Sequence, residues 1–144
     1  SLLFKMRAKG VEVVVSEVSA HAIYLKKMCG IVADIAVLTN VTQDHLDFFH
    51  TFKDYEKTKL SYFCPKYVKK AVVNVDDNAG KRLASMLDKS DMDVVTYGLN
   101  NPADAFAIDV YEGIDGIRFV ANLCDDLVDI RSSLYGEFNV YNLG

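Results

Sequence analysis

The sequence predicts an α/β fold, with a mainly parallel sheet flanked by helices and then a small antiparallel β meander. Over residues 1–98, short apolar segments rich in β-branched residues alternate with helix-like segments. Such segments are typical of buried parallel strands, and parallel strands are joined by crossover helices. Over residues 99–134, shorter segments with apolar alternation are separated by turn residues, which predicts hairpins.

The first elements are predicted to be a helix end, a strand and a second helix. Ser1–Lys9 is predicted to be the C-terminal end of a helix, which Gly10 terminates. Val11–Ser16, with the sequence VEVVVS, is β-branched and apolar and is predicted to be a buried parallel strand. Ser19–Met28 is predicted to be helical, with Gly30 at its end.

The next elements carry most of the titratable residues of interest. Asp34–Thr39 is predicted to be the second strand, and Val41–His50 a loop or a short helix. Thr51–Phe63 is predicted to be a helix, with Thr51 as its N-cap and Pro65 just beyond its end.

The remaining elements continue the alternation and then change character. The parallel part is completed by a strand, a helix and a strand: Ala71–Asn74, Asp76–Lys89 and Asp93–Tyr97. The meander is predicted to contain Phe106–Tyr111, Ile117–Asn122 and Leu127–Leu134. Residues 135–144 are expected to begin a further element. With no initiator Met, residues 1–144 are expected to be part of one domain of a longer protein.

Composition excludes several classes of function. The 144 residues carry a net charge of −4 and no basic stripe, so no nucleic-acid partner is expected. No apolar run is long enough to cross a bilayer, so no membrane association is expected. The three cysteines, Cys29, Cys64 and Cys124, show neither disulfide nor metal-ligand spacing, which favours a reducing, cytoplasmic location.

Polar residues follow three of the predicted strands. Glu17, Asn40 and Asn74 each stand where a strand ends. Ligands of open parallel sheets bind beyond the carboxyl ends of the strands, so neighbouring strands would place these residues in one crevice. The alternative is that each residue caps a helix or completes a turn.

His45 is a candidate ligand for a divalent cation, with Glu17 as an oxygen ligand beside it. The alternative is a solvent-exposed loop histidine held by Asp47.

Lys59 lies on the apolar stripe of its predicted helix, in line with Phe52, Tyr55 and Tyr62. A lysine there must extend to water, form an ion pair or lose its charge. A neutral amine could react with carbon dioxide to give a carbamate, which would replace a cation by oxygen ligands.

Five short motifs together resemble the central, ATP-binding domain of the Mur ligases. They are Glu17-Val18-Ser19-Ala20-His21, Thr39-Asn40-Val41-Thr42-Gln43-Asp44-His45-Leu46-Asp47, Tyr55-Glu56-Lys57-Thr58-Lys59, Asn74-Val75-Asp76-Asp77 and Gly136-Glu137-Phe138-Asn139-Val140-Tyr141-Asn142. Their order and spacing are most similar to the members that add the third residue of the peptidoglycan stem. The resemblance covers nearly the whole chain.

The resemblance implies an ATP-dependent ligase of peptidoglycan synthesis. Such an enzyme converts a carboxylate of UDP-N-acetylmuramoyl-dipeptide to an acyl phosphate, and the amine of an amino acid then displaces phosphate. The expected cofactor is Mg²⁺, with ATP as a substrate and a diamino acid, lysine or diaminopimelate, as the third substrate. A monomer is expected.

The resemblance also implies roles for individual residues. Glu17, His45 and a carbamylated Lys59 would hold magnesium, with Lys59 and His45 as the catalytic pair and Glu17 near the ATP phosphates. Asn74 would contact adenine. The predicted substrate-binding residues are Ser19, Lys27 and Asn40.

Some family features differ or are absent. Ala20 stands where the family commonly has a second serine, and Lys27 stands near a family arginine but lacks its bidentate fork. The sequence contains no G-x-x-G-K-T/S phosphate loop, so the isolated chain is expected to be inactive. Alternative interpretations are a ligase like folylpolyglutamate synthase, a non-catalytic nucleotide- or metal-binding module, and an α/β domain whose acids and histidines are caps.

Overall fold

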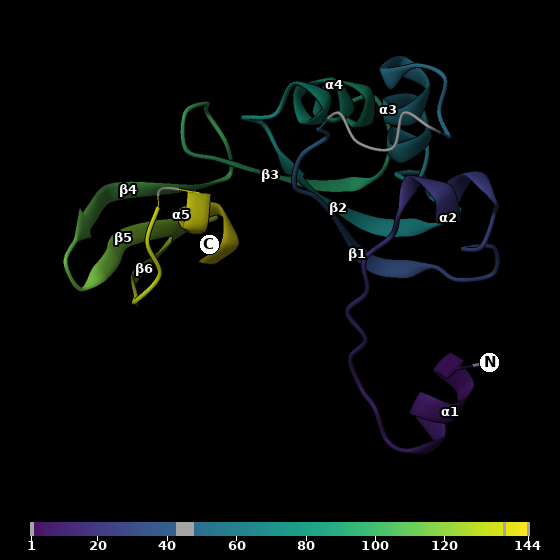
Figure 1. Ribbon diagram of the computed structural model, residues 1–144, viewed down its shortest axis with the longest axis horizontal. Helices are drawn as coiled ribbons and strands as arrows, with labels where there is room; N and C mark the ends of the chain where they lie inside the picture. The colour runs from purple at the N-terminus through teal and green to yellow at the C-terminus, as the bar shows by residue number, and fades with distance from the viewer. Residues whose placement is uncertain (1, 43–47, 137, 144) are drawn as a thin grey trace.

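The computed structural model describes residues 2–42, 48–136 and 138–143 and contains one six-stranded sheet in the order β1-β2-β3-β4-β5-β6 (Figure 1). The strands are β1 (Ala33–Leu38), β2 (Val68–Asn74), β3 (Asp93–Gly98), β4 (Ala105–Gly113), β5 (Gly116–Leu123) and β6 (Asp126–Ser132). The helices are α1 (Leu2–Ala8), α2 (Ala20–Tyr24), α3 (Phe52–Leu60), α4 (Asn78–Leu87) and α5 (Phe138–Leu143).

The first four strands are parallel and the last two pairs are antiparallel. β1 pairs with β2, β2 with β3 and β3 with β4 in parallel, with Leu38 opposite Val73 and Asn74 opposite Tyr97. β4–β5 and β5–β6 are antiparallel. The predicted fold class is therefore confirmed, and the meander continues the same sheet rather than forming a second one.

Three helices cover one face of the parallel strands. Ala36 and Leu38 of β1 and Ala71 and Val73 of β2 are buried against α2, α3 and α4, which lie together above the sheet in Figure 1. Burial of this apolar surface stabilises the fold by roughly 25 cal/mol per Å². Side-chain oxygens cap two of these helices: Thr51 caps α3, as predicted, and Asp77 caps α4.

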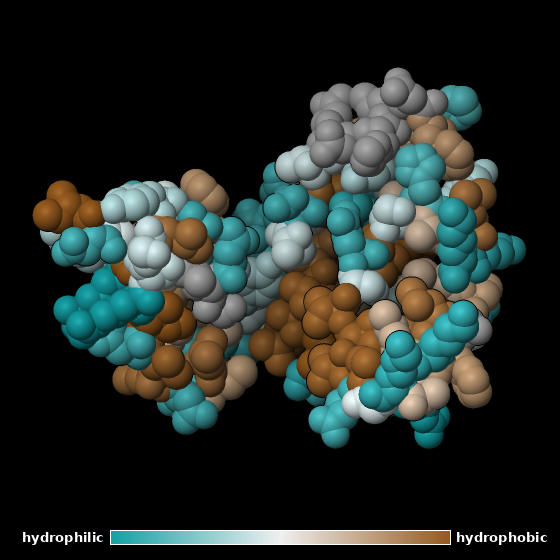
Figure 2. All heavy atoms as spheres, turned by 60° about the horizontal axis from the view of Figure 1, so that its bottom comes forward, coloured by the Kyte–Doolittle hydropathy of each residue, from teal (hydrophilic) through white to brown (hydrophobic). Residues whose placement is uncertain are grey.

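The opposite face of β1 and β2 is apolar and open to solvent. Ile35 and Val37 are 58% and 55% exposed, and Val72 beside them is half-buried. Figure 2 shows the broad apolar area on this side of the molecule. At the other end of the sheet, Val140 of α5 is buried with Ile117 and Phe119 of β5 in a second, smaller core.

Residues with positive φ lie in or next to the turns of the meander hairpins. Cys124 and Asp125 occupy the β5–β6 turn with φ of 53° and 79°, the conformation that a tight two-residue hairpin requires. Gly116 has φ of 113° at the start of β5, where a Cβ would lie 2.1 Å from the Ser132 carbonyl oxygen.

The prediction of a buried strand at Val11–Ser16 was wrong. These residues form no strand, and Val13 and Val15 are 77% and 94% exposed. Their β-branched side chains favour a strand, but a strand also needs a hydrogen-bonded neighbour, and no strand in the described part of the chain pairs with them.

Three predicted helices are shorter in the structure than expected, and one of them, predicted over Asp76–Lys89, spans Asn78–Leu87. The helix expected over Ser19–Met28 ends at Tyr24, and turns lead to Gly30, which has φ of 82°. The helix expected over Thr51–Phe63 ends at Leu60. Among the described residues no helix has both the length and the apolar character needed to cross a membrane.

Candidate functional site

The carboxyl ends of β1 and β2 are tied together by the side chain of Asn74. Its Nδ2 donates to the carbonyl oxygen of Thr39 at 2.8 Å, and its Oδ1 accepts from the backbone N–H of Asp76 at 2.8 Å. The residue is 9% exposed. Asn40, directly after Thr39, therefore lies at the same edge of the sheet as Asn74, as the sequence predicted for this pair.

A close backbone approach fixes Asn74 from the other side. The first turn of α4 crosses the end of β2 so closely that a Cβ on Gly80 would lie 1.8 Å from the Asn74 carbonyl oxygen. Only glycine fits this contact. The backbone of Asn74 is thus held by α4, and its amide by β1 and Asp76.

The carboxylate of Asp76 gathers four further groups at this edge. It accepts hydrogen bonds from the backbone N–H groups of Leu99 and Asn100, from Asn101 Nδ2 at 2.6 Å and from the Tyr141 hydroxyl at 2.9 Å. We call these five residues the Asp76 cluster. It joins the end of β2, the β3–β4 loop and α5.

The surroundings of Asp76 favour its charged form. Burial alone raises the pKa of this carboxyl, but the hydrogen bonds from Asn101, Leu99, Asn100 and Tyr141 outweigh burial and lower the pKa below its ordinary value of 3.8. Asp76 therefore carries a negative charge at neutral pH and stays an acceptor for all of its partners.

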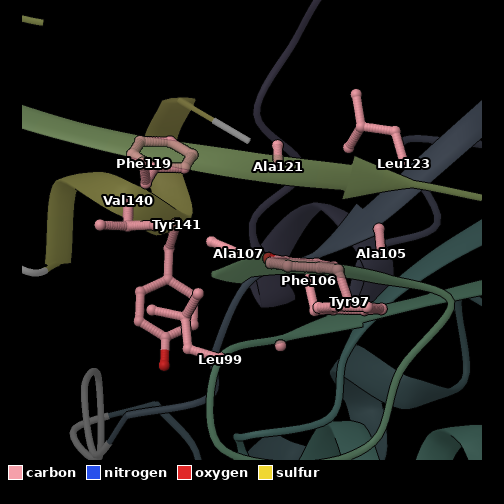
Figure 3. A pocket seen from close by; sticks show the side chains of 11 residues that line it. Tyr97, Leu99, Ala105, Phe106, Ala107, Phe119, Ala121, Leu123, Val140 and Tyr141 are labelled. Atoms are coloured by element: carbon pink, nitrogen blue, oxygen red, sulfur yellow. The ribbon is translucent and has the colours of Figure 1, made fainter. Parts of the chain in front are cut away.

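A small apolar pocket of about 30 Å³ lies beside the Asp76 cluster, between α5 and strands β3 to β5. Figure 3 shows Tyr141 and Val140 reaching it from the helix, with Phe119 and Ala121 on the strand. Its volume is that of a single water molecule, so it is a packing defect of the second core rather than a nucleotide site.

Lys59 occupies the apolar stripe that the sequence assigned to it. Tyr55 and Tyr62 on the same stripe are buried, and Lys59 is half-buried. Its Nζ lies 5.2 Å from the centre of the Tyr55 ring, within the range of a cation–π interaction. This contact was not among the outcomes expected from the sequence, which were extension to water, an ion pair or loss of the charge.

The other predicted ligand residues lie on the segment before β1. Glu17 is exposed and does not stand at the end of a strand, because Val11–Ser16 is not a strand; that part of the prediction was wrong. Ser19 caps α2, and its Oγ accepts from the N–H of Ala22 at 3.2 Å. Lys27 is exposed in the turn that follows α2.

Only part of the predicted magnesium site lies within the described residues. His45 lies outside the described residues. Within the described ranges, no group of three or more His, Cys, Asp or Glu residues is arranged to hold a metal ion. The described part of the chain contains two of the three predicted ligands, Glu17 and Lys59, so the magnesium site stays a prediction.

Sequence reasoning missed two features of this edge. Asp76 and Tyr141 were noted only as members of two separate motifs, and nothing in their spacing of 65 residues linked them. The packing of His21 was also not predicted: the centre of its ring lies 4.2 Å from that of Phe48 and 5.5 Å from that of Phe49. The signal that could have predicted this packing is the apolar pair Phe48-Phe49, which offers two aromatic rings to the His21 ring of α2.

Comparison with known proteins supplies the family. The family model described as Mur ligase middle domain matches residues 1–144. A UDP-N-acetylmuramoyl-L-alanyl-D-glutamate–2,6-diaminopimelate ligase of Caldanaerobacter subterraneus subsp. tengcongensis is 38% identical over 135 residues, which are 93% of this chain and 27% of that protein. A ligase of the same name from Neisseria meningitidis is 37% identical over 145 residues, 99% of this chain and 30% of that protein.

Solved structures agree with this result. A structure of a UDP-N-acetylmuramoyl-L-alanyl-D-glutamate–2,6-diaminopimelate ligase superimposes with a TM-score of 0.77 and 30% identity, over 88% of this chain and 26% of that one. The apo form of L. casei FPGS has a TM-score of 0.68 at 20% identity, over 96% of this chain and 33% of that one, which shows a shared fold. The chain thus spans less than a third of the length of the two curated relatives described above. It belongs to the Mur ligase middle-domain family.

Proposed function

We propose that this chain is part of an ATP-dependent ligase that joins 2,6-diaminopimelate to UDP-N-acetylmuramoyl-L-alanyl-D-glutamate in peptidoglycan synthesis. The observation that carries the proposal is that relatives 37–38% identical over at least 93% of the chain bear the name of this ligase. Of the two diamino acids that the motifs left open, these names favour diaminopimelate.

The proposed reaction has two steps. A carboxylate oxygen of the UDP-linked dipeptide attacks the γ-phosphorus of ATP and ADP leaves, which gives an acyl phosphate. The amine of diaminopimelate then attacks the acyl carbon, phosphate leaves, and the amine proton passes to a base. Both steps bring anions together, so positive charge near the transferred phosphoryl group is required.

Within this chain, the carboxyl edge of β1 and β2 is the proposed nucleotide end. Asn74 has one Nδ2 proton and one Oδ1 lone pair beyond its internal bonds, and this donor–acceptor pair is what an amide needs to recognise a base edge. Asn40, Ser19 and Lys27 stay the proposed contacts to the UDP-linked substrate. Magnesium, held by Glu17, His45 and Lys59, stays a prediction of the family resemblance.

Lys59 is proposed to react with carbon dioxide. The neutral amine attacks the carbon atom, an N–C bond forms, one C–O π pair moves to oxygen, and a proton leaves to solvent. The support for this proposal is the place of Lys59 in the Tyr55-Glu56-Lys57-Thr58-Lys59 motif and its half-buried position on the apolar stripe of α3.

An assay of the complete gene product tests the ligase. The enzyme is supplied with ATP and UDP-N-acetylmuramoyl-L-alanyl-D-glutamate, and with diaminopimelate, lysine or no amino acid, while phosphate release and the tripeptide product are measured. Product with diaminopimelate is expected. Turnover with folate and glutamate instead would assign it to the folylpolyglutamate synthase type, and binding of ATP without turnover would favour a non-catalytic module.

A labelling experiment tests Lys59 separately. The protein is equilibrated with ¹³C-bicarbonate, and a carbamate ¹³C resonance is sought by NMR. The signal is expected in the parent and absent in Lys59→Gln, whereas Lys53→Gln, on the exposed face of the same helix, should retain it. A parent spectrum without the signal would contradict the carbamate.

A further inference from the structure

The Asp76 cluster connects three segments at the carboxyl edge near Asn74. Its members come from the β2–α4 turn, the β3–β4 loop and α5. Asp76 also touches Asn74 directly, because its N–H donates to Asn74 Oδ1. The orientation of the Asn74 amide therefore depends on the position of the Asp76 backbone.

The Asp76 backbone is itself held through its carboxylate. Two oxygens accept from four donors, and the carboxylate sits directly over Gly98, where a Cβ would lie 3.1 Å from both oxygens. An amide in its place would keep only one acceptor oxygen and would turn an NH₂ group toward the donors that now surround it. The charge of the carboxylate strengthens each of these bonds.

We infer that Asp76 is a positioning residue of the nucleotide end, and that its carboxylate sets the orientation of the Asn74 amide for adenine. This inference rests on the proposed function. Asp76 acts through Asn74, whose internal bonds to Thr39 and Asp76 select the two polar atoms left for a ligand.

The chain contains a matched control for this role. Asp104 also anchors the β3–β4 loop, because its carboxylate accepts from the N–H of Thr96 at 2.8 Å and from its Oγ1 at 2.7 Å. The pKa of Asp104 is likewise lowered, first by the backbone hydrogen bond from Thr96. In the described part of the chain, the hydrogen bonds of the Asp104 side chain go to Thr96 and not to Asn74 or Asp76, so its loss weakens the same loop without turning the Asn74 amide.

The kinetic test compares Asp76→Asn with Asp104→Asn in the complete gene product. Asp76→Asn is expected to raise KM for ATP about fivefold or more with kcat within about twofold, the pattern of a lost binding interaction. Asp104→Asn is expected to lower the thermal midpoint similarly while changing KM by less than about twofold. Equal KM values in the two variants would overturn the inference.

A second measurement tests the positioning role of Asp76 without relying on ligase activity. In ¹H–¹⁵N spectra of the 144-residue chain, the Asn74 side-chain amide should exchange slowly in the parent and in Asp104→Asn, and rapidly in Asp76→Asn. Where Asp76→Asn does not fold, Asn101→Ala removes one donor to the carboxylate and should give a smaller change in the same direction. An Asn74 amide that stays protected in these variants overturns the inference, whereas an inactive parent enzyme refutes only the proposed function.

Discussion

The hydroxyl of Tyr141 donates a hydrogen bond to the carboxylate of Asp76 at 2.9 Å, across 65 residues of sequence. The same hydroxyl oxygen lies 3.4 Å from Asn100 Nδ2 and can accept from it. Together with buried Val140, this contact fixes the six-residue α5 to the end of the sheet. So short a helix is unstable alone and depends on such contacts.

Removing the hydroxyl should therefore loosen α5 first. Tyr141→Phe is expected to increase hydrogen exchange of the α5 amides about tenfold and to lower the free energy of unfolding by about 1.5 kcal/mol, because one hydrogen bond to a charged acceptor is lost. Amide exchange followed by NMR measures both. Tyr111→Phe, at an exposed tyrosine of β4, is the control. Unchanged α5 exchange would show that Val140 alone holds the helix.

The stability of the fold should fall in acid. Hydrogen bonds lower the folded-state pKa of Asp76, and those from Thr96 lower that of Asp104, so the native state binds fewer protons than the unfolded chain near pH 4. Their contribution is complete above the unfolded pKa of about 3.9 and is lost as pH falls through the folded pKa.

The urea concentration at the unfolding midpoint should thus stay constant from about pH 7 to about pH 4 and decrease between about pH 4 and pH 3. Asp76→Asn should have a lower midpoint at neutral pH and a shallower acid drop. A pH profile parallel to that of the parent would contradict the role given to the carboxylate.

Gly80→Ala should be severely destabilising. The added Cβ would lie 1.8 Å from the Asn74 carbonyl oxygen, a backbone atom that cannot rotate away, so α4 must shift from β2. The expected loss is about 3 kcal/mol or more, the upper range for overpacking. Chemical denaturation measures it. Gly113→Ala is the control, because its Cβ meets only the exposed Tyr111 ring and a side chain can move.

Thr51→Ala should weaken the start of α3. Thr51 Oγ1 accepts from the N–H of Asp54 at 3.1 Å and donates to its carboxylate at 2.7 Å. Loss of this cap should lower the free energy of unfolding by about 1 kcal/mol. Thr58→Ala, inside the same helix, should be close to neutral, since alanine is the better helix former. Equal effects of the two substitutions would argue against capping.

Local chemistry in the sequence predicted most of the parallel fold. The apolar segments became β1, β2 and β3, and Thr51 became the N-cap that its side chain suggested. The stripe carrying Lys59 was also predicted, because helical periodicity alone decides which residues share a face. Asn40 and Asn74 met at one edge, since parallel neighbours place their carboxyl ends together.

Only the tertiary structure decided which distant groups meet. Val11–Ser16 has the propensity of a strand, yet propensity cannot supply a hydrogen-bonded neighbour, and the segment is extended and exposed. Asp76 and Tyr141 carried no mutual signal in the sequence, because a hydrogen bond between a turn and a later helix depends on the register of every strand between them. The sequence by itself determined most of the parallel elements, the Thr51 cap and the family motifs. The packing of β2, β4 and α5 determined that the acid of one motif and the tyrosine of another form one cluster.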